Sequence, residues 1–257
     1  MSRFVNLELG GESEEQSSEK GLVRDEPYYL REGQAAFENA EFEKALRLYA
    51  KVLEYNPQNA SAWTAQARLL IELGEYREAK LWADKALERF PNEAELLAVK
   101  AVALGRSGEC QSALAFSDAS IEERGAQTPY VWLARGDVLL ACREARADYC
   151  LEKALMLAPR NSFIAWLAAR IRFHYEQFAV ALKILQEAVQ WNTGHFLLWL
   201  DLGRCQEALG FVDAAQISYT QALDLNGNCE GAQEALNGLA SRGLGGRVRG
   251  LWRRLVK

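Results

Sequence analysis

An alanine recurs every 34 residues along most of this 257-residue chain. The series consists of Ala45, Ala79, Ala113, Ala147, Ala181 and Ala215. A constant step held over six occurrences is typical of a protein built from copies of one structural unit. Because a unit of this length cannot bury its apolar face alone, each copy must pack against its neighbours.

Two further positions keep the same step and indicate what the unit contains. Small or β-branched residues stand seven positions after each alanine, at Val52, Ala86, Ser120, Ala154, Ala188 and Ala222. Helix-stopping or turn-forming residues follow at Pro57, Pro91, Gly125, Pro159, Thr193 and Gly227. Since seven residues make two helical turns, the pattern predicts a helix with a small-residue face that a neighbouring helix approaches closely. The third position predicts where that helix stops.

The best unit also carries two aromatic residues and two glycines at fixed places. It contains Trp199, Leu202, Gly203, Gly210, Ala215, Tyr219 and Ala222, and a second good unit contains Trp63, Ala67, Gly74, Tyr76, Ala79, Ala86 and Pro91. These residues resemble the tetratricopeptide repeat family, whose unit is an antiparallel helix pair. The resemblance covers about residues 26–227 and implies an all-α, right-handed superhelical solenoid of six helix-turn-helix units.

The fourth unit departs from the regular phase. Trp132 and Gly136 stand one residue late, whereas Ala147 and Pro159 stay in phase. We therefore expect one residue gained between units and one lost in the turn near residues 142–145.

The chain divides into four predicted segments. Residues 1–24 form a disordered acidic segment and residues 25–227 form the six repeats. Residues 228–241 form an amphipathic capping helix, which shields the last repeat from water. Residues 242–257 form a glycine hinge followed by a basic amphipathic tail.

The tail combines an apolar helical face with clustered positive charge. Its members are Arg247, Val248, Arg249, Leu251, Trp252, Arg253, Arg254, Leu255, Val256 and Lys257. Such a helix suits an anionic membrane surface, or it docks on a partner protein or on the chain's own groove. A frayed terminus remains an alternative. Nucleic acid is disfavoured because the net charge is -5 and the body is acidic.

Nothing in the sequence predicts catalysis, a cofactor or a metal. The two histidines, His174 and His195, belong to no metal-ligand pattern, and the glycine-rich run at residues 243–250 lacks the Gly-Lys-Ser/Thr of a phosphate loop. The five cysteines are odd in number and show no Cys-x-x-Cys spacing. With neither a secretory signal nor a spanning helix, we expect a reduced, cytoplasmic protein, peripheral at a membrane if the tail binds lipid.

The resemblance implies that the first helices of successive units line a concave groove that holds a peptide or helix of a partner. The register places on this face Gln34, Phe37, Arg68, Ile71, Arg106, Tyr130, Asp137, Phe163, Trp166, Arg170, Phe173 and Arg204. Aromatic and arginine side chains favour the later units as the interaction site. Alternatively, Phe163 and Phe173 pack between repeats, and Arg68 and Arg170 pair with local acids.

One familiar partner class is excluded by the residues. Members of the family that bind the C-terminal tails of Hsp70 and Hsp90 chaperones use a clamp of Lys, Asn and Arg side chains. The matching residues here are Leu30, Gln34, Ala65, Glu95 and Val99, which cannot form it.

These features predict a non-catalytic scaffold or adaptor that holds a protein in its groove and tethers to anionic membrane through its tail. A link between a cytoskeletal filament and membrane, as in proteins likened to kinesin light chains, would suit this layout. The alternative is a soluble assembly factor or regulatory subunit whose C-terminal helix docks on its own groove or on a partner.

Overall fold

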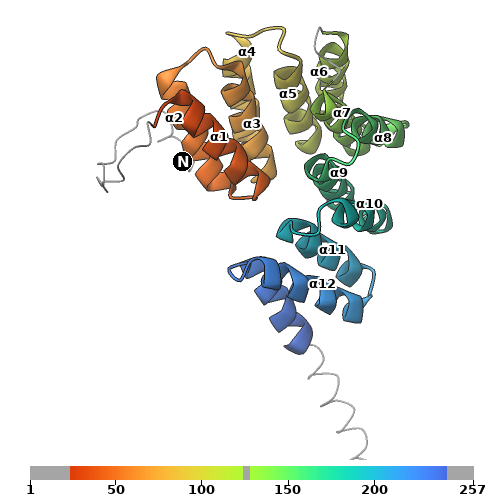
Figure 1. Cartoon of the computed structure of the whole chain (residues 1–257). Coiled ribbons are helices and arrows are strands. Elements are labelled where there is room, and N and C mark those ends of the chain that lie inside the picture. Colours follow the sequence, from red (N-terminus) through yellow and green to blue (C-terminus); the bar gives the residue numbers. More distant parts are fainter. Residues whose placement is uncertain (1–23, 124–127, 242–257) are drawn as a thin grey trace, which may run out of the picture. The chain divides into compact units, whose positions relative to one another are not determined.

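The computed structural model describes residues 24–123 and 128–241, and every regular element within these ranges is an α-helix (Figure 1). The helices are α1 (Glu26–Glu38), α2 (Phe42–Tyr55), α3 (Ala60–Glu72), α4 (Tyr76–Leu87), α5 (Ala94–Arg106), α6 (Cys110–Glu122), α7 (Pro129–Ala141), α8 (Ala147–Leu157), α9 (Ser162–His174), α10 (Phe178–Trp191), α11 (Phe196–Ala208) and α12 (Val212–Leu225). A last helix covers residues 230–241. The predicted acidic segment, apart from Arg24, and the predicted hinge and tail lie outside the described residues.

The chain divides into two compact units, an N-terminal unit (Met1–Cys150) and a C-terminal unit (Leu151–Lys257). The division falls inside α8, within the stretch 25–227 that the sequence presents as one array. In the N-terminal unit consecutive helices from α1 to α7 contact each other. The first helices of neighbouring pairs also make contact, α3 with α5 and α5 with α7. In the C-terminal unit α9 to α12 pack in the same manner. The predicted all-α fold of stacked helix-turn-helix units is confirmed; the right-handed course of the whole array stays a prediction.

The periodic small residues lie where the helices meet. All six alanines of the first series and all six residues of the second are buried, and they fall on the second helix of each pair. Small side chains at these places let the first helices approach closely without leaving cavities. The period therefore marks the core of the fold.

Every pair is closed by the same turn. A backbone N–H bonds the carbonyl five residues earlier at Glu41–Ala36, Glu75–Leu70, Glu109–Leu104, Glu144–Leu139, Gln177–Arg172 and Phe211–Gln206. The residue before each donor has positive φ, at Ala40, Gly74, Gly108, Arg143, Glu176 and Gly210. This is the Schellman motif that ends a helix.

The fourth pair absorbs the phase shift seen in the sequence. Helix α7 begins at Pro129, one residue later than a 34-residue step from α5. The following turn ends with a second left-handed residue, Arg146 at φ 73°. Helix α8 consequently begins at Ala147 and lacks the first turn that its counterparts have.

Gly203 shows why a glycine is needed on the first helix. A Cβ atom there would lie 2.6 Å from ring carbons of Tyr219, which is fully buried. The Tyr219 hydroxyl donates a hydrogen bond of 2.8 Å to Glu207. The glycine thus lets the aromatic ring of the second helix pack flat against the backbone of the first.

The helix at residues 230–241 occupies the place predicted for a capping helix. Its Ala232 and Leu239 side chains are buried. A Cβ atom at Gly231 would lie 3.1 Å from Arg204 and 3.6 Å from Leu200, so this helix packs closely on α11.

Replacing Glu176 with Gly should raise the free energy of unfolding by about 1 kcal/mol. An L-residue in the left-handed region costs roughly 1–2 kcal/mol, part of which the greater unfolded-chain entropy of glycine offsets. The matched change Gly210→Ala should lower the free energy of unfolding by about 1 kcal/mol. A Cβ atom at Gly210 meets nothing within 4 Å, so that change tests backbone conformation alone.

Urea denaturation of the full chain, followed by far-ultraviolet circular dichroism, measures both effects. Destabilisation by Glu176→Gly would contradict the prediction, because it would mean that the glutamate side chain contributes more than its backbone conformation costs.

Candidate functional site: a pocket on the first helices of the N-terminal unit

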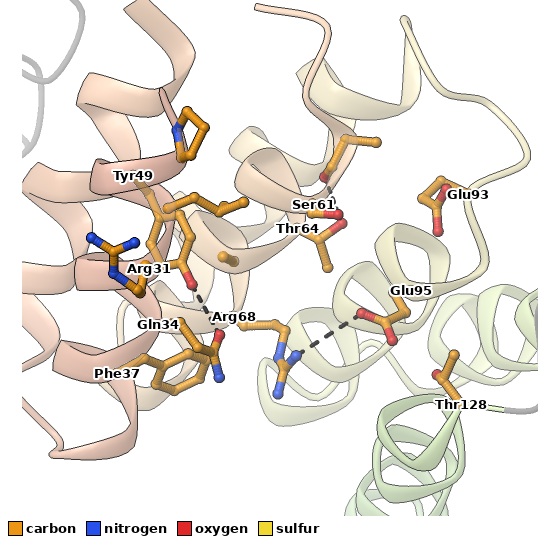
Figure 2. A pocket seen from close by; sticks show the side chains of 14 residues that line it. Arg31, Gln34, Phe37, Tyr49, Ser61, Thr64, Arg68, Glu93, Glu95 and Thr128 are labelled. Carbon is orange, nitrogen blue, oxygen red and sulfur yellow. Dashed lines mark hydrogen bonds and ion pairs between the residues drawn. The ribbon is translucent and has the colours of Figure 1, made fainter. Parts of the chain in front are cut away.

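An open pocket of about 800 Å³ lies in the N-terminal unit (Figure 2). Its lining residues are Pro27, Leu30, Arg31, Gln34, Phe37, Tyr49, Ala60, Ser61, Thr64, Ala65, Arg68, Glu93, Glu95 and Thr128. Most of them come from α1 and from the N-terminal halves of α3 and α5. The first helices of successive pairs therefore form a hollow surface here.

Helix starts place several of these residues at the pocket. Asp25 caps α1 by accepting a hydrogen bond of 3.1 Å from the Tyr28 backbone N–H, and Pro27 follows in the first turn. Asn59 caps α3 in the same way, 3.0 Å from the Ala62 N–H. Because a capped helix begins at a defined residue, these caps fix which side chains of α1 and α3 reach the pocket.

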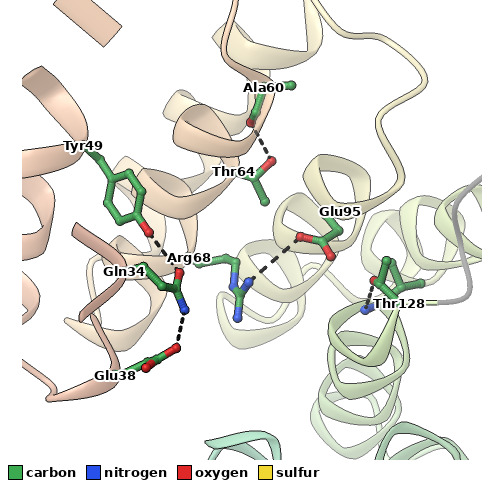
Figure 3. A network of polar contacts seen from close by, with 9 residues as sticks. Gln34, Glu38, Tyr49, Ala60, Thr64, Arg68, Glu95 and Thr128 are labelled. Carbon is green, nitrogen blue, oxygen red and sulfur yellow. Dashed lines mark hydrogen bonds and ion pairs between the residues drawn. The ribbon is translucent and has the colours of Figure 1, made fainter. Parts of the chain in front are cut away.

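A polar chain crosses from α2 to α1 along one wall (Figure 3). The Tyr49 hydroxyl donates to Gln34 Oε1 at 3.1 Å, and Gln34 Nε2 donates to Glu38 Oε1 at 2.8 Å. Burial raises the pKa of Tyr49 to about 12, although Arg68 opposes the shift. The phenol is therefore a neutral donor at physiological pH, and it orients the Gln34 amide.

Arg68 is the central charge of the pocket. Its guanidinium lies 3.8 Å from the ring centre of Tyr130 and 5.2 Å from that of Phe37. It also contacts the Glu95 carboxylate at 3.9 Å (Figure 3). One side chain of α3 thus contacts α1, α5 and α7. Of the two alternatives for Arg68, the structure shows the local pair.

The aromatic contacts hold Arg68 in one orientation. A guanidinium over an aromatic face is attracted by the ring quadrupole, and the attraction grows when water is excluded. The Nε atom of Arg68 is buried and has no hydrogen-bond partner among the described atoms. Burial also raises the pKa of Tyr130, against the opposing effect of Arg68, so the ring stays neutral.

Arg106 and Asp137, both predicted to face the groove, are paired with each other. Arg106 Nε lies 3.2 Å from Asp137 Oδ1, and Nη2 lies 2.7 Å from Oδ2. The two side chains are only 9% and 4% exposed. Burial alone would lower the pKa of Arg106, but the charge and hydrogen bonds of Asp137 outweigh it and raise the pKa. The pair joins α5 to α7.

In the C-terminal unit the predicted hot spot is inside the helix packing. Trp166 is 1% exposed, and its indole N–H donates to Asp201 at 2.7 Å, which joins α9 to α11. Arg170 lies 4.9 Å from the Trp166 ring, and Phe163 lies 5.6 Å from it. Arg204 pairs with Asp201 at 2.9 Å.

Phe173 likewise contacts Phe178 of α10, with 5.0 Å between ring centres. Like Phe163, it is half-buried. Both aromatic side chains therefore have ring partners within the pair formed by α9 and α10. That they pack between repeats stays a prediction.

Four residues assigned to an exposed face are corrected by their burial. Phe37, Ile71, Asp137 and Trp166 are each at most 4% exposed. The physical reason is that a first helix packs both on its own second helix and on the neighbouring first helices. Its free face is consequently narrower than helical periodicity suggests.

Five lining residues were not predicted from the sequence, namely Arg31, Ser61, Thr64, Glu93 and Thr128. A signal for their place was present, however. Four of the positions compared with the chaperone-tail clamp, Leu30, Gln34, Ala65 and Glu95, line this pocket, whereas Val99 is buried. Four of the five compared positions thus lie in this pocket, although their residues differ in chemistry from the clamp.

Within residues 24–123 and 128–241, no cluster of three or more metal-ligand side chains is found. Over the same ranges, no helix has both the length and the apolar character needed to cross a bilayer. The five cysteines, all in the described part of the chain, are free thiols.

A family model described as tetratricopeptide repeat matches residues 36–103. The fold is similar to that of TTC0263, a thermophilic TPR protein in Thermus thermophilus, with a TM-score of 0.51 and 18% identity over 84% of this chain and 98% of that chain. It is also similar to PilW, a widely conserved type IV pilus biogenesis factor, with a TM-score of 0.50 and 18% identity over 84% of this chain and 100% of that one. Residues 36–103 therefore match the tetratricopeptide repeat, and the chain has the fold of tetratricopeptide repeat proteins.

Tetratricopeptide repeat proteins generally mediate protein–protein interactions, and their fold is a scaffold that is generally non-catalytic. No curated protein matches this sequence at a significant level. Because fold alone does not specify function, the ligand of the pocket depends on the chemistry of its own residues.

Replacing Asp137 with Asn should lower the free energy of unfolding by about 3–5 kcal/mol, because it leaves the Arg106 charge buried without its counter-ion. Urea denaturation of the full chain measures the loss. Asp118→Asn is the matched control. Asp118 pairs with Arg135 at the same 2.7 Å, but its side chain is 58% exposed. The control change should lower the free energy of unfolding by about 1 kcal/mol or less. Equal effects of the two changes would argue against a special role of the buried pair.

Proposed function

We propose that this protein is a non-catalytic scaffold that binds an extended peptide segment of a partner protein in the pocket of its N-terminal unit. The observation that supports the proposal is the open hollow of about 800 Å³ on the first helices of successive pairs. Its volume falls in the range of about 300–1,000 Å³ that is usual for ligand sites.

The lining combines the two kinds of surface that peptide recognition needs. Pro27 and Leu30 offer apolar surface, whereas Gln34 and Ser61 offer polar groups. Apolar surface favours burial of side chains, and directed polar groups orient a backbone that would otherwise lose its hydrogen bonds to water. Gln34 is already held by Tyr49 and Glu38, which reduces the conformational entropy lost on binding.

We further propose that the tail, residues 242–257, attaches the protein to an anionic membrane surface. Leu251, Trp252 and Leu255 recur at helical spacing among arginines, and each basic residue contributes about 1 kcal/mol near the lipid. The protein then acts as an adaptor that holds a partner near a membrane. A soluble assembly factor or regulatory subunit, whose tail docks on protein, is the alternative. A cytoskeletal partner stays a prediction from the sequence.

Replacing Ser61 with Trp should strongly weaken peptide binding at the pocket. Ser61 is the second residue of α3 and is exposed, so a large side chain there fills the hollow without entering the core. Dodecapeptides selected from a random displayed library on the full chain provide the ligands, and fluorescence polarisation gives their affinity. We expect a loss of about tenfold or more.

Ser112→Trp is the matched control, because Ser112 is equally exposed near the start of α6 and is not a lining residue. It should leave the affinity unchanged. Selected peptides that bind Ser61→Trp and the original chain equally would place the peptide site elsewhere and contradict the proposal.

The tail is tested by co-sedimentation with vesicles of neutral and of anionic lipid. The full chain should pellet with anionic vesicles at low salt and be released at high salt, because the attraction of exposed charges is screened. A chain ending at Ser241 should stay in solution. If the full chain does not pellet with either lipid, the membrane tether is wrong.

A further inference from the structure

The pocket contains two charges of opposite sign that the protein leaves without a close ion pair. Arg31 projects from α1, and its side chain is 67% exposed. Its nearest carboxylate among the described residues is Glu32, at 4.0 Å, the outer limit of an ion pair. Glu93 is the N-cap residue of α5, yet its side chain makes no capping hydrogen bond. No cation of the described residues pairs with the half-buried Glu93 carboxylate.

These two charges lie on opposite sides of the hollow (Figure 2). Arg68 and Glu95 lie between them and contact each other. Because Arg68 is also held by two aromatic rings, the central pair is fixed. Arg31 lies 5.9 Å from the ring centre of Tyr28, a longer contact that leaves its exposed guanidinium open to a ligand. Across the pocket the charges therefore run from positive at α1 to negative at α5.

A partly buried carboxylate without a partner has lost water without gaining a cation in exchange. A ligand that supplies a cation to Glu93 offsets that cost, and one that also supplies an anion to Arg31 keeps the pocket neutral. A peptide with a single sign of charge satisfies one side and is repelled by the other.

We propose that the pocket selects extended peptides that carry one basic side chain, for Glu93, and one acidic side chain, for Arg31, in a fixed order. This inference rests on the proposed function and specifies the class of peptide. The chain's own residues 242–257 carry basic residues and no acid, so they do not meet the requirement at Arg31. The fixed order also gives the bound peptide one direction along the groove.

The test uses individual peptides from the selection on the full chain, synthesised and measured by fluorescence polarisation. Binders should share a basic and an acidic residue at a constant separation. Glu93→Gln and Arg31→Gln should each weaken binding by about threefold to fivefold, the effect of losing one partly exposed ion pair.

A double-mutant cycle assigns the partners. Changing the basic residue of the peptide to Gln should weaken binding to the original chain and cause no further loss with Glu93→Gln. The acidic residue should behave in the same way towards Arg31→Gln. Glu93→Lys should recover affinity for a peptide whose basic residue is replaced by Glu, which a merely structural effect of the substitution would not produce.

Glu88→Gln and Arg47→Gln are the matched controls, because both residues are exposed in the N-terminal unit and neither lines the pocket. They should leave affinity unchanged. The inference would be overturned if the selected peptides carried one sign of charge, or if the losses in the cycles were additive. It would also be overturned if binding appeared only after residues 242–257 were removed. The proposed function survives such results as long as Ser61→Trp still blocks binding, and it fails separately if that variant binds normally.

Discussion

Close contact between neighbouring helices is the constraint on which the rest of this structure depends. Alanine stands at the first periodic position of every second helix, and small or β-branched residues stand two turns later, where all are buried. Gly203 extends the same principle to the first helix, because any side chain there would collide with Tyr219. A solenoid unit has no core of its own, so the distance between helices decides whether apolar area is buried at all.

The pocket is a consequence of that stacking. Successive first helices lie side by side in the N-terminal unit, and their N-terminal halves carry the lining residues. Arg68 joins three neighbouring first helices through two aromatic rings and Glu95, while the buried pair of Arg106 and Asp137 joins α5 to α7. Charged side chains thus contribute to the packing of the scaffold, and only those at the margins of the pocket remain available to a ligand.

Sequence periodicity located the helices and their turns well but located the candidate site less well. The phase shift at Trp132 identified the irregular fourth pair, where Arg146 takes a left-handed conformation and α8 loses its first turn. In contrast, Trp166 is of a residue type that is frequent in interaction hot spots, yet its side chain is buried and donates a hydrogen bond to Asp201. Register places a residue on a helix face, but it does not show which part of that face a neighbouring helix covers.

The sequence by itself determined the fold class and the repeat length, because helix breakers and small residues act through local backbone geometry and contact distance. It also predicts that the chaperone-tail clamp is absent, since that clamp depends only on which side chains are present. Only the tertiary structure decided which charges are free. Arg68 and Glu95 are 27 residues apart in the chain and pair across the pocket, whereas Arg31 and Glu93 are left at its two sides, because ion pairing depends on distances between helices that no local pattern specifies.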